Sequence, residues 1–294
     1  MDLVQSFFNY LQFEKRYSAH TLTSYRNDLT GFIDFLQDKY DGIPIQEACH
    51  IHIRSWMVEL MAKGIQPRSV NRKLSTLKSF YKYLLKNGRI SKSPLLKVTA
   101  PKVSKRLPIF LDEQSMAKLV VKPESNEYQS FRDYIIVKLF YSTGLRVSEL
   151  ASLKCADINF SQKNIKVLGK GNKERIMPLE KSILEELKLY MLIREEQLQD
   201  KLSEALFLSN RLSPIYPRAI HRIVTCQIAM VSKIEKKSPH ILRHTFATHL
   251  LNHGAEINAI KELLGHANLS ATQVYTHNSI EKLKNTYKKA HPKA

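Results

Sequence analysis

Six residues in the second half of the chain have the side-chain types that phosphoryl transfer to a protein nucleophile requires. One is a tyrosine and the others are cationic or can become so: Arg146, Lys170, His240, Arg243, His266 and Tyr275. Arginine suits the non-bridging oxygens of a phosphate because its planar fork donates two hydrogen bonds and stays charged. Lysine or histidine can protonate a leaving oxygen. No metal-ligand pattern accompanies these residues, so we expect no metal and no other cofactor.

The spacing of these residues indicates how they would reach one phosphate. His240 and Arg243 lie three positions apart on a predicted helix, so both side chains can point into one cleft. Lys170 lies on a glycine-flanked hairpin tip, from which it can swing onto a substrate, and His266 follows a helix-ending glycine. Arg146 lies beside another glycine break, where a helix start also offers backbone donors to an anion.

Each of these residues also has an ordinary structural interpretation. A tyrosine in an amphipathic helix is usually a core or interface residue, and Gly-Lys-Gly alone is more often a plain hairpin tip. His244, His249 and His253 have a spacing compatible with zinc, but neither an HExxH motif nor a carboxylate partner accompanies them. We expect these histidines near the core or supporting the site, with His244 as an orienting residue. The co-occurrence of all six residues in a basic chain favours a catalytic role over these structural ones.

The charge of the chain points to a polyanionic partner. A length of 294 residues is sufficient for two domains, and 43% hydrophobic residues indicate a packed globular protein. The formal net charge is +19. Between Leu60 and Leu111 there are thirteen Lys and Arg and no acidic residue. Because a solvated helical face usually mixes both signs, this stretch favours contact with a phosphate backbone.

A membrane surface is the competing polyanion, and the sequence does not favour it. No apolar run approaches the roughly 18 residues of a spanning helix, and the N-terminus does not resemble a signal peptide. Cys49, Cys155 and Cys226 are odd in number, widely spaced and without a CxxC motif, so we expect reduced core thiols in a cytoplasm. The sequence thus predicts a cytoplasmic protein that binds nucleic acid.

Helices are predicted for the first hundred residues. Ser18 opens one of them, and another runs over about 66–86, with apolar positions on one face and basic residues at i+4 spacing on others. The stretch 91–108 carries three prolines and several basic residues, which is typical of an extended, charged connection. We therefore predict a domain boundary near Lys105, giving domains 1–104 and 105–294.

The second domain is predicted to be mostly helical with one β interruption. Short strands are expected at 157–160, 164–168 and 174–179, and helices resume at about 181. Further helices are expected over 239–252 and up to Gly265, the second with Ile257, Ile260, Leu263 and Leu264 inward. Ser270 and Gln273 form a capping box, which would place Tyr275 in the first turns of a short helix.

The chain resembles the tyrosine recombinase (phage integrase) family, and within it the Xer-type site-specific recombinases. The matching stretches are YSTGLRVSEL at 141–150, GKGNKER at 169–175, PHILRHTFATHL at 239–250, and the segment from LGH at 264–266 to YTH at 275–277. The segments 17–21 and 290–294 also fit, so the resemblance covers essentially the whole chain. Together these motifs are highly specific, although Gly-Lys-Gly alone would be weak.

The resemblance implies a role for each residue. Tyr275 would attack the scissile phosphate and form a 3′-phosphotyrosyl link, releasing a 5′-hydroxyl. Arg146 and Arg243 would hold the non-bridging oxygens with the help of His266. Lys170 would protonate the leaving oxygen, and His240 would be the acid–base partner of the tyrosine. Because the covalent bond stores the phosphodiester energy, rejoining would need neither ATP nor metal.

The resemblance also implies a mainly α fold with a small antiparallel sheet. An N-terminal helical core-binding domain and a C-terminal catalytic domain would clamp duplex DNA. Four protomers, identical or paired with a paralogous recombinase, would form a synapse in which the C-terminal helix, here 279–289, docks on a neighbour. Family analogy adds a DNA translocase such as FtsK as a regulator. The implied setting is the bacterial nucleoid, with chromosome dimer resolution as the role.

Three other functions compete with this interpretation. A mobile-element integrase would use the same chemistry, although the chain lacks the arm-binding domain common among phage and transposon integrases. A type IB topoisomerase-like enzyme would share the nucleophile and relax DNA without synapsis. A non-catalytic DNA-binding or architectural protein is permitted by basicity alone, but it would have no use for a nucleophile. The six unaltered positions favour site-specific strand exchange.

Overall fold

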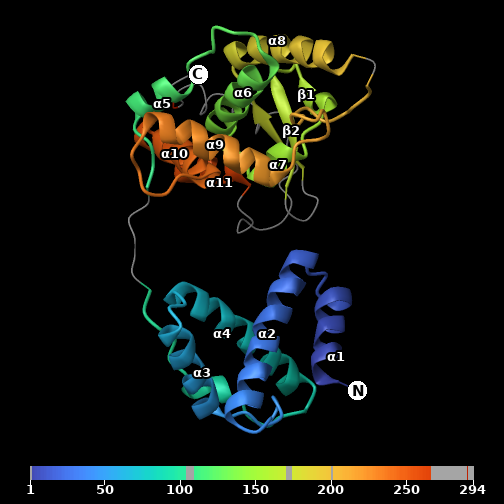
Figure 1. Ribbon diagram of the computed structural model, residues 1–294, viewed down its shortest axis with the longest axis vertical. Helices are drawn as coiled ribbons and strands as arrows, with labels where there is room; N and C mark the ends of the chain where they lie inside the picture. The colour runs from blue at the N-terminus through green and yellow to red at the C-terminus, as the bar shows by residue number, and fades with distance from the viewer. Residues whose placement is uncertain (1, 104–108, 170–173, 200, 266–289, 291–294) are drawn as a thin grey trace. The chain divides into compact units, whose positions relative to one another are not determined.

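The computed structural model describes residues 2–103, 109–169, 174–199, 201–265 and 290. The chain divides into two compact units, Met1–Arg106 and Leu107–Ala294, here called the N-terminal and C-terminal units (Figure 1). The predicted boundary between 104 and 105 falls among residues 104–108, which lie outside the described part, and it stays a prediction. Among the described residues no helix is long and apolar enough to cross a membrane.

The N-terminal unit is built from helices around one aromatic-rich core. Its elements in chain order are α1 (Leu3–Asn9), a π-helical turn (Tyr10–Glu14), α2 (Ala19–Lys39), α3 (His50–Ala62), α4 (Pro67–Lys86) and a 3₁₀ turn (Pro94–Lys97). Phe7 of α1, Phe32 of α2, Trp56 of α3 and Phe80 of α4 meet in the core, each at most 3% exposed. The predicted start of α2 is confirmed, because the Ser18 hydroxyl accepts a hydrogen bond from the Thr21 amide.

Helix α4 separates apolar and basic side chains onto different faces. Pro67 begins the helix, where its missing amide hydrogen costs nothing, and the predicted span 66–86 is confirmed. Its inward face is buried in the core and comprises Val70, Leu74, Leu77, Phe80, Tyr81 and Leu84. The exposed positions include every basic residue predicted at i+4 spacing: Arg68, Arg72, Lys78, Lys82 and Lys86. The helix therefore presents a cationic face with no acidic residue in it.

The extended connection predicted over 91–108 is shorter than expected. Its first part forms the 3₁₀ turn Pro94–Lys97, which packs against α3. There the Arg54 guanidinium donates to the Lys97 carbonyl at 2.5 Å, and the Asn71 amide donates to the Pro101 carbonyl at 3.0 Å. The preceding helix α4 ends at Lys86, before the first of these prolines, and the two backbone carbonyls attach the segment to the N-terminal unit as far as Pro101.

The C-terminal unit contains helices and a small sheet. Its helices are α5 (Glu113–Leu119), α6 (Tyr128–Thr143), α7 (Val147–Ala151), α8 (Lys181–Leu198), α9 (Pro217–Val231), α10 (Pro239–Asn252) and α11 (Ile257–Leu264), with a 3₁₀ turn at Cys155–Asp157. The sheet is antiparallel in the order β1 (Ile158–Asn159), β2 (Asn164–Leu168) and β3 (Glu174–Pro178). The predicted α fold with a small antiparallel sheet is confirmed, with β1 shorter than expected.

Helix α6 forms the centre of the C-terminal unit. Apolar residues occupy every side of it, and it packs against α8, α9 and α10 (Figure 1). A helix that is buried all round is held by tertiary packing. The predicted helix 239–252 is confirmed as α10, whose Leu242, Phe246 and Leu250 are fully buried. The C-terminal end of α6 lies close to α10 and α11.

Gly144 makes that close approach possible. It ends α6 with φ +60°, in the left-handed region, and a Cβ there would lie 2.5 Å from Phe246 Cδ1 and 2.8 Å from Leu264 Cδ2. Any other residue would be strained in its backbone and would collide with α10 and α11. The glycine therefore sets Arg146, two residues later, beside the ends of these helices.

Two smaller predictions are wrong. Ile257 was expected to face inward on α11, but it is 55% exposed because it opens the helix, whereas Ile260, Leu263 and Leu264 are buried as expected. The three cysteines are free, yet Cys226 is exposed and the other two are only partly buried, so none is a core thiol.

Candidate active site

Three arginines converge on the C-terminal end of α11. The donor–acceptor pairs are Arg175 Nε with the Leu263 carbonyl (3.1 Å), Arg243 Nη2 with the Leu264 carbonyl (2.7 Å) and Arg146 Nη2 with the Gly265 carbonyl (3.1 Å). Carbonyls in the last turn of a helix have no partner within the helix, and they carry its partial negative charge. We call Arg146, Arg175 and Arg243, with Glu149, the arginine cluster.

Arg146 lies at the start of α7 and is held by one carboxylate. Its backbone amide donates to Glu149 Oε2 at 2.8 Å, and its Nη1 donates to Glu149 Oε1 at 2.6 Å. The side chain of Arg146 is 33% exposed, so the guanidinium keeps access to solvent. The expectation that this helix start offers backbone donors to an anion is wrong for the Arg146 amide, because the carboxylate already takes it.

Glu149 is a buried, ionised carboxylate at the centre of the cluster. Arg175 donates to both of its oxygens, at 2.9 and 2.8 Å, and Arg146 donates to both as well. Burial alone raises the pKa of Glu149, but the hydrogen bonds and charge of Arg175, with those of Arg146, outweigh burial and lower it to about 2. Glu149 is therefore charged at neutral pH.

Arg243 reaches the same place from α10. Its Nη1 donates to the Gly144 carbonyl at 2.6 Å and its Nη2 to the Leu264 carbonyl, so it bridges the end of α6 and the end of α11. Burial, together with the neighbouring positive charge of Arg146, lowers the pKa of Arg243 to about 10. Arg243 is still cationic at pH 7. Three guanidinium groups against one carboxylate leave an excess of two positive charges in the cluster.

His240 lies one turn before Arg243 on α10, and it is exposed. The helix begins at Pro239 directly before it, so the imidazole stands in the first turn of α10. The structure thus brings Arg146 and Arg243 together and places His240 on the same helix as Arg243, near its N-terminus. The predicted pairing of His240 and Arg243 in one cleft stays a prediction.

Two further histidines, His249 of α10 and His253 directly after this helix, belong to the surrounding structure. His249 is buried, and its Nδ1 is hydrogen-bonded to the Tyr141 hydroxyl at 2.9 Å. His253 Nδ1 lies 2.8 Å from the His249 carbonyl, and its Nε2 lies 3.5 Å from Glu113. In the part of the chain that the structure describes, no group of three or more His, Cys, Asp or Glu could hold a metal ion. The expectation that His249 lies near the core is confirmed.

Three of the six predicted residues lie outside the described residues: Lys170, His266 and Tyr275. Lys170 belongs to the connection between β2 and β3, whose ends pair as Leu168 with Glu174. His266 follows Gly265 directly in the sequence, next to the carbonyl that accepts from Arg146. The predicted capping box at Ser270 and the C-terminal helix 279–289 lie outside the described residues as well.

Sequence reasoning missed Glu149 and Arg175, although both left a signal. Glu149 lies three residues after Arg146, at the position where an acidic side chain reaches back to the amide that precedes a helix. Arg175 and Met177, two positions apart, share the inward side of β3, and Arg175 pairs with the buried Val167 of β2. A charged residue at an inward strand position needs a buried partner.

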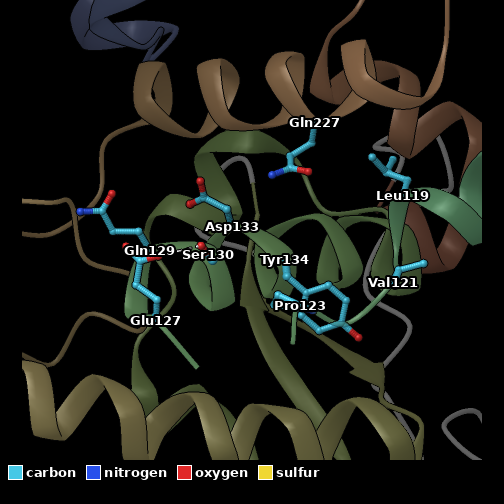
Figure 2. Close-up of a pocket in the computed structure, with 9 residues that line it drawn as sticks. All are labelled: Leu119, Val121, Pro123, Glu127, Gln129, Ser130, Asp133, Tyr134 and Gln227. Carbon is cyan, nitrogen blue, oxygen red and sulfur yellow. Dashed lines mark hydrogen bonds between the residues drawn. The ribbon is translucent and has the colours of Figure 1, made fainter. Parts of the chain in front are cut away.

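A small pocket elsewhere in the C-terminal unit is separate from this cluster. It has a volume of about 290 Å³ and lies between the segment after α5, the first turns of α6, and Gln227 of α9 (Figure 2). Asp133 and Tyr134 of α6 line it, whereas Arg146, His240 and Arg243, the three predicted residues that the structure describes, do not. The Tyr134 hydroxyl is occupied by hydrogen bonds with Glu186 and Lys138.

Comparisons with known proteins agree on one family. Residues 110–282 match the phage integrase family, and residues 4–88 match the phage integrase N-terminal SAM-like domain. The chain is 41% identical to the tyrosine recombinase XerC of Thermodesulfovibrio yellowstonii over 98% of this chain and 96% of that protein. It is 38% identical to XerC of Bacillus subtilis, over 100% and 97% of the two chains.

A solved structure gives the same fold. The XerH site-specific recombinase, bound to its palindromic difH substrate after cleavage, is 22% identical, with a TM-score of 0.70 over 92% of this chain and 80% of that one. The arginine cluster, formed by the start of α7, β3 and α10, thus lies in a chain that matches two family domains. The same chain has full-length relatives and a solved structure with the same fold. The chain belongs to the phage integrase family and is a site-specific tyrosine recombinase, an enzyme that breaks and rejoins DNA.

Proposed function

We propose that the protein cuts and rejoins duplex DNA at a specific site through a covalent 3′-phosphotyrosine at Tyr275. The observation that carries this proposal is the convergence of Arg146 and Arg243 at the end of α11. The carbonyls that they bind belong to Leu264 and Gly265, eleven and ten residues before Tyr275 in the sequence. Both guanidinium groups are positively charged at neutral pH, and the cluster carries an excess of positive charge that an entering phosphate compensates.

In the proposed reaction the Tyr275 hydroxyl oxygen forms a bond to the scissile phosphorus while the bond to the 5′ oxygen breaks. The phenol has an unperturbed pKa of about 10, so presenting phenolate at pH 7 costs about 4 kcal/mol without help from a base or nearby cations. His240 accepts the phenolic proton, and Lys170 gives a proton to the leaving 5′ oxygen. Arg146, Arg243 and His266 stabilise the charge on the non-bridging oxygens. The reverse steps rejoin the strand.

The N-terminal domain, residues 1–104, supplies contacts to the DNA backbone in this proposal. The exposed basic face of α4 and the absence of acidic residues between Leu60 and Leu111 support it. Contacts of this kind hold the protein on the duplex without reading its sequence. Residues 105–294 form the catalytic domain, and the two domains clamp the duplex.

The protein acts as a tetramer on DNA, formed by identical protomers or with a paralogous recombinase. We assign it to the bacterial cytoplasm, at the nucleoid, and to chromosome dimer resolution, with a DNA translocase such as FtsK as its regulator. The full-length likeness to bacterial XerC proteins supports this role over that of a mobile-element integrase. We expect the DNA site that the protein recognises to lie in the host chromosome, away from the ends of any mobile element. A recognised site at the end of a mobile element would overturn the chromosomal role.

A covalent-adduct experiment tests the chemistry. The recognised duplex is selected from a random-sequence pool by binding, and a nicked version of it is incubated with the protein without added metal. We expect a denaturation-resistant protein–DNA adduct for the wild type and none for Tyr275→Phe, which still binds the duplex. Tyr216→Phe is the matched control because Tyr216 is an exposed tyrosine of the same unit, and it retains the adduct.

The leaving-group assignment has its own test on the same duplex. Lys170→Ala slows cleavage of the normal strand, and a 5′-thio leaving group, which needs no proton, restores most of the rate. An adduct with Tyr275→Phe would show that another residue is the nucleophile. A Lys170→Ala defect that the thio substrate does not relieve would assign the proton to another group.

A further inference from the structure

Arg175 is a buried arginine that the proposed reaction does not use. It lies in β3, its side chain is 5% exposed, and its three donor nitrogens are all engaged inside the protein. Two of them bind the two oxygens of Glu149, and Nε binds the Leu263 carbonyl at 3.1 Å. A guanidinium so placed has no access to a DNA phosphate, so its effect on the reaction must pass through its partners.

Both partners of Arg175, Glu149 and the end of α11, also contact Arg146. Glu149 binds the Arg146 amide and guanidinium, and Arg175 fixes the plane of that carboxylate by a two-point contact. Leu263 lies two residues before Gly265, whose carbonyl accepts from Arg146 Nη2 at 3.1 Å. Arg175 therefore holds both of the groups between which the Arg146 side chain is fixed.

Arg175 also determines how much of the charge of Arg146 remains uncompensated. Glu149 is buried and ionised, and with Arg146 as its only cation the two would form a neutral pair. Arg175 supplies a second positive charge at 2.8 Å from the carboxylate, which offsets its negative charge. The positive charge of Arg146 then stays available to an incoming phosphate.

We propose that Arg175 is a positioning residue, which orients Arg146 through Glu149 and the end of α11 and keeps its charge available for the scissile phosphate. The inference rests on the proposed role of Arg146 as a ligand of the non-bridging oxygens. It adds a strand residue, five positions after Lys170, to the set that determines the rate of cleavage.

The test compares Arg175→Met, which keeps an unbranched side chain as far as the position of Nε and removes the charge and the donors, with Arg194→Met. Arg194 is the matched control because it is also buried in the C-terminal unit and donates to backbone carbonyls, those of Ala205 and Ser203. Arg175→Lys is added because it keeps the charge and the fold if Arg175→Met does not fold. Cleavage is measured at saturating concentrations of the selected nicked duplex, with a scissile phosphate or a scissile methylphosphonate.

A methylphosphonate carries no negative charge, so its cleavage depends less on an arginine that neutralises the phosphate. We expect Arg175→Met to slow cleavage of the phosphate about 10²-fold, with duplex binding unchanged. On the methylphosphonate its deficit relative to wild type shrinks to within about threefold. Arg175→Lys lies between, and Arg194→Met has the same small deficit on both substrates. An equal Arg175→Met deficit on both substrates, or no deficit, would overturn the proposal.

A second readout does not depend on cleavage. In ¹⁵N spectra of arginine side chains of the full chain without DNA, the Nη signals of Arg146, assigned with Arg146→Lys, are expected to show slow rotation in wild type and averaging in Arg175→Met. Unchanged rotation contradicts the positioning role. If wild type forms no adduct on the selected duplex, the proposed chemistry is wrong, and these spectra still decide whether Arg175 holds Arg146.

Discussion

A buried carboxylate binds two cationic side chains in each unit of the molecule, but the two sites leave their cations in different surroundings. In the N-terminal unit Asp28 of α2 accepts from Arg72 at 2.5 Å and from Lys73 at 3.1 Å, and from the Thr76 hydroxyl. The Arg72 side chain is 50% exposed. The Lys73 side chain is 18% exposed. In the C-terminal unit the more exposed cation of Glu149, Arg146, is 33% exposed and the more enclosed one, Arg175, is 5% exposed, so each is more enclosed than its counterpart at Asp28.

The difference matches two ways of using a positive charge. A half-exposed arginine on the basic face of α4 can follow the backbone of a duplex, which needs charge but little exact geometry. An arginine that stabilises a transition state must be placed before the substrate arrives. The Arg72 guanidinium accordingly makes its hydrogen bonds to Asp28 and Ser24 through Nη1 alone, whereas Arg146 binds a carboxylate through Nη1 and a helix carbonyl through Nη2.

The largest expected effect is that of Glu149→Gln. Removing the charge of Glu149 leaves Arg175 buried without its counter-ion, so we expect the C-terminal unit to lose about 4 kcal/mol of unfolding free energy and cleavage to fall about 10²-fold. Asp28→Asn is expected to cost about 1 kcal/mol, because Arg72, the half-exposed one of its two cationic partners, can be resolvated, and to leave cleavage at saturating DNA unchanged.

The single tryptophan allows the unfolding of the two units to be measured separately. Trp56 is buried in the N-terminal unit, so its fluorescence in a urea titration reports that unit, while circular dichroism reports both. Asp28→Asn should move the fluorescence transition alone, and Glu149→Gln should move only the remaining transition. A shift of the fluorescence transition by Glu149→Gln would contradict the independence of the two sites.

Acid should weaken the C-terminal unit through Glu149. Its pKa of about 2 in the folded state lies below the ordinary value of 4.5, so its stabilisation is fully present above pH 4.5 and is lost as the pH falls toward 2. The two values correspond to about 3 kcal/mol. Urea midpoints at several pH values should show the difference between wild type and Glu149→Gln shrinking below pH 4.5. A difference that stays constant down to pH 3 would mean that the carboxylate is not held by its arginines.

The glycines that follow α4 and α6 offer a second contrast. Gly88 and Gly144 have nearly equal φ, +63° and +60°, but a Cβ at Gly88 meets nothing within 4 Å, whereas one at Gly144 meets Phe246 and Leu264. We expect Gly88→Ala to cost about 1 kcal/mol from backbone strain alone and Gly144→Ala about 3 kcal/mol, because crowding adds to it. The same urea titrations measure both. Equal costs would show that α10 and α11 move aside easily.

The smallest expected effect concerns the basic face of α4. Lys82→Ala should reduce the slope of log affinity against log salt by about 1 on a labelled random-sequence duplex, without changing cleavage at saturation. Lys39→Ala is the control, because Lys39 is an exposed lysine of the same unit but lies beside Asp38 and Asp41 in the sequence. Equal changes for both variants would mean that the DNA contact is not confined to the basic face.

Local sequence patterns predicted the helices and strands well, but they did not predict contacts between residues far apart in the sequence. The bounds of α4 and α10 follow from a proline at the start and from apolar spacing that lasts to the end, all within one segment. The contact of Arg175 with Glu149 joins residues 26 positions apart, and that with Leu263 joins residues 88 apart. No periodicity encodes such distances. Ile257 was misassigned because amphipathic spacing does not tell how far a core extends past the first residue of a helix.

The use of three successive carbonyls at the end of α11 has a consequence for how this protein and its relatives can vary in length. Adding one residue within α11 would rotate its last turn by about 100° and advance it by about 1.5 Å. The carbonyls of Leu263, Leu264 and Gly265 would then no longer meet guanidinium groups from β3, α10 and the start of α7. Insertions and deletions should therefore be tolerated in the connections around α11 and be excluded from the helix itself.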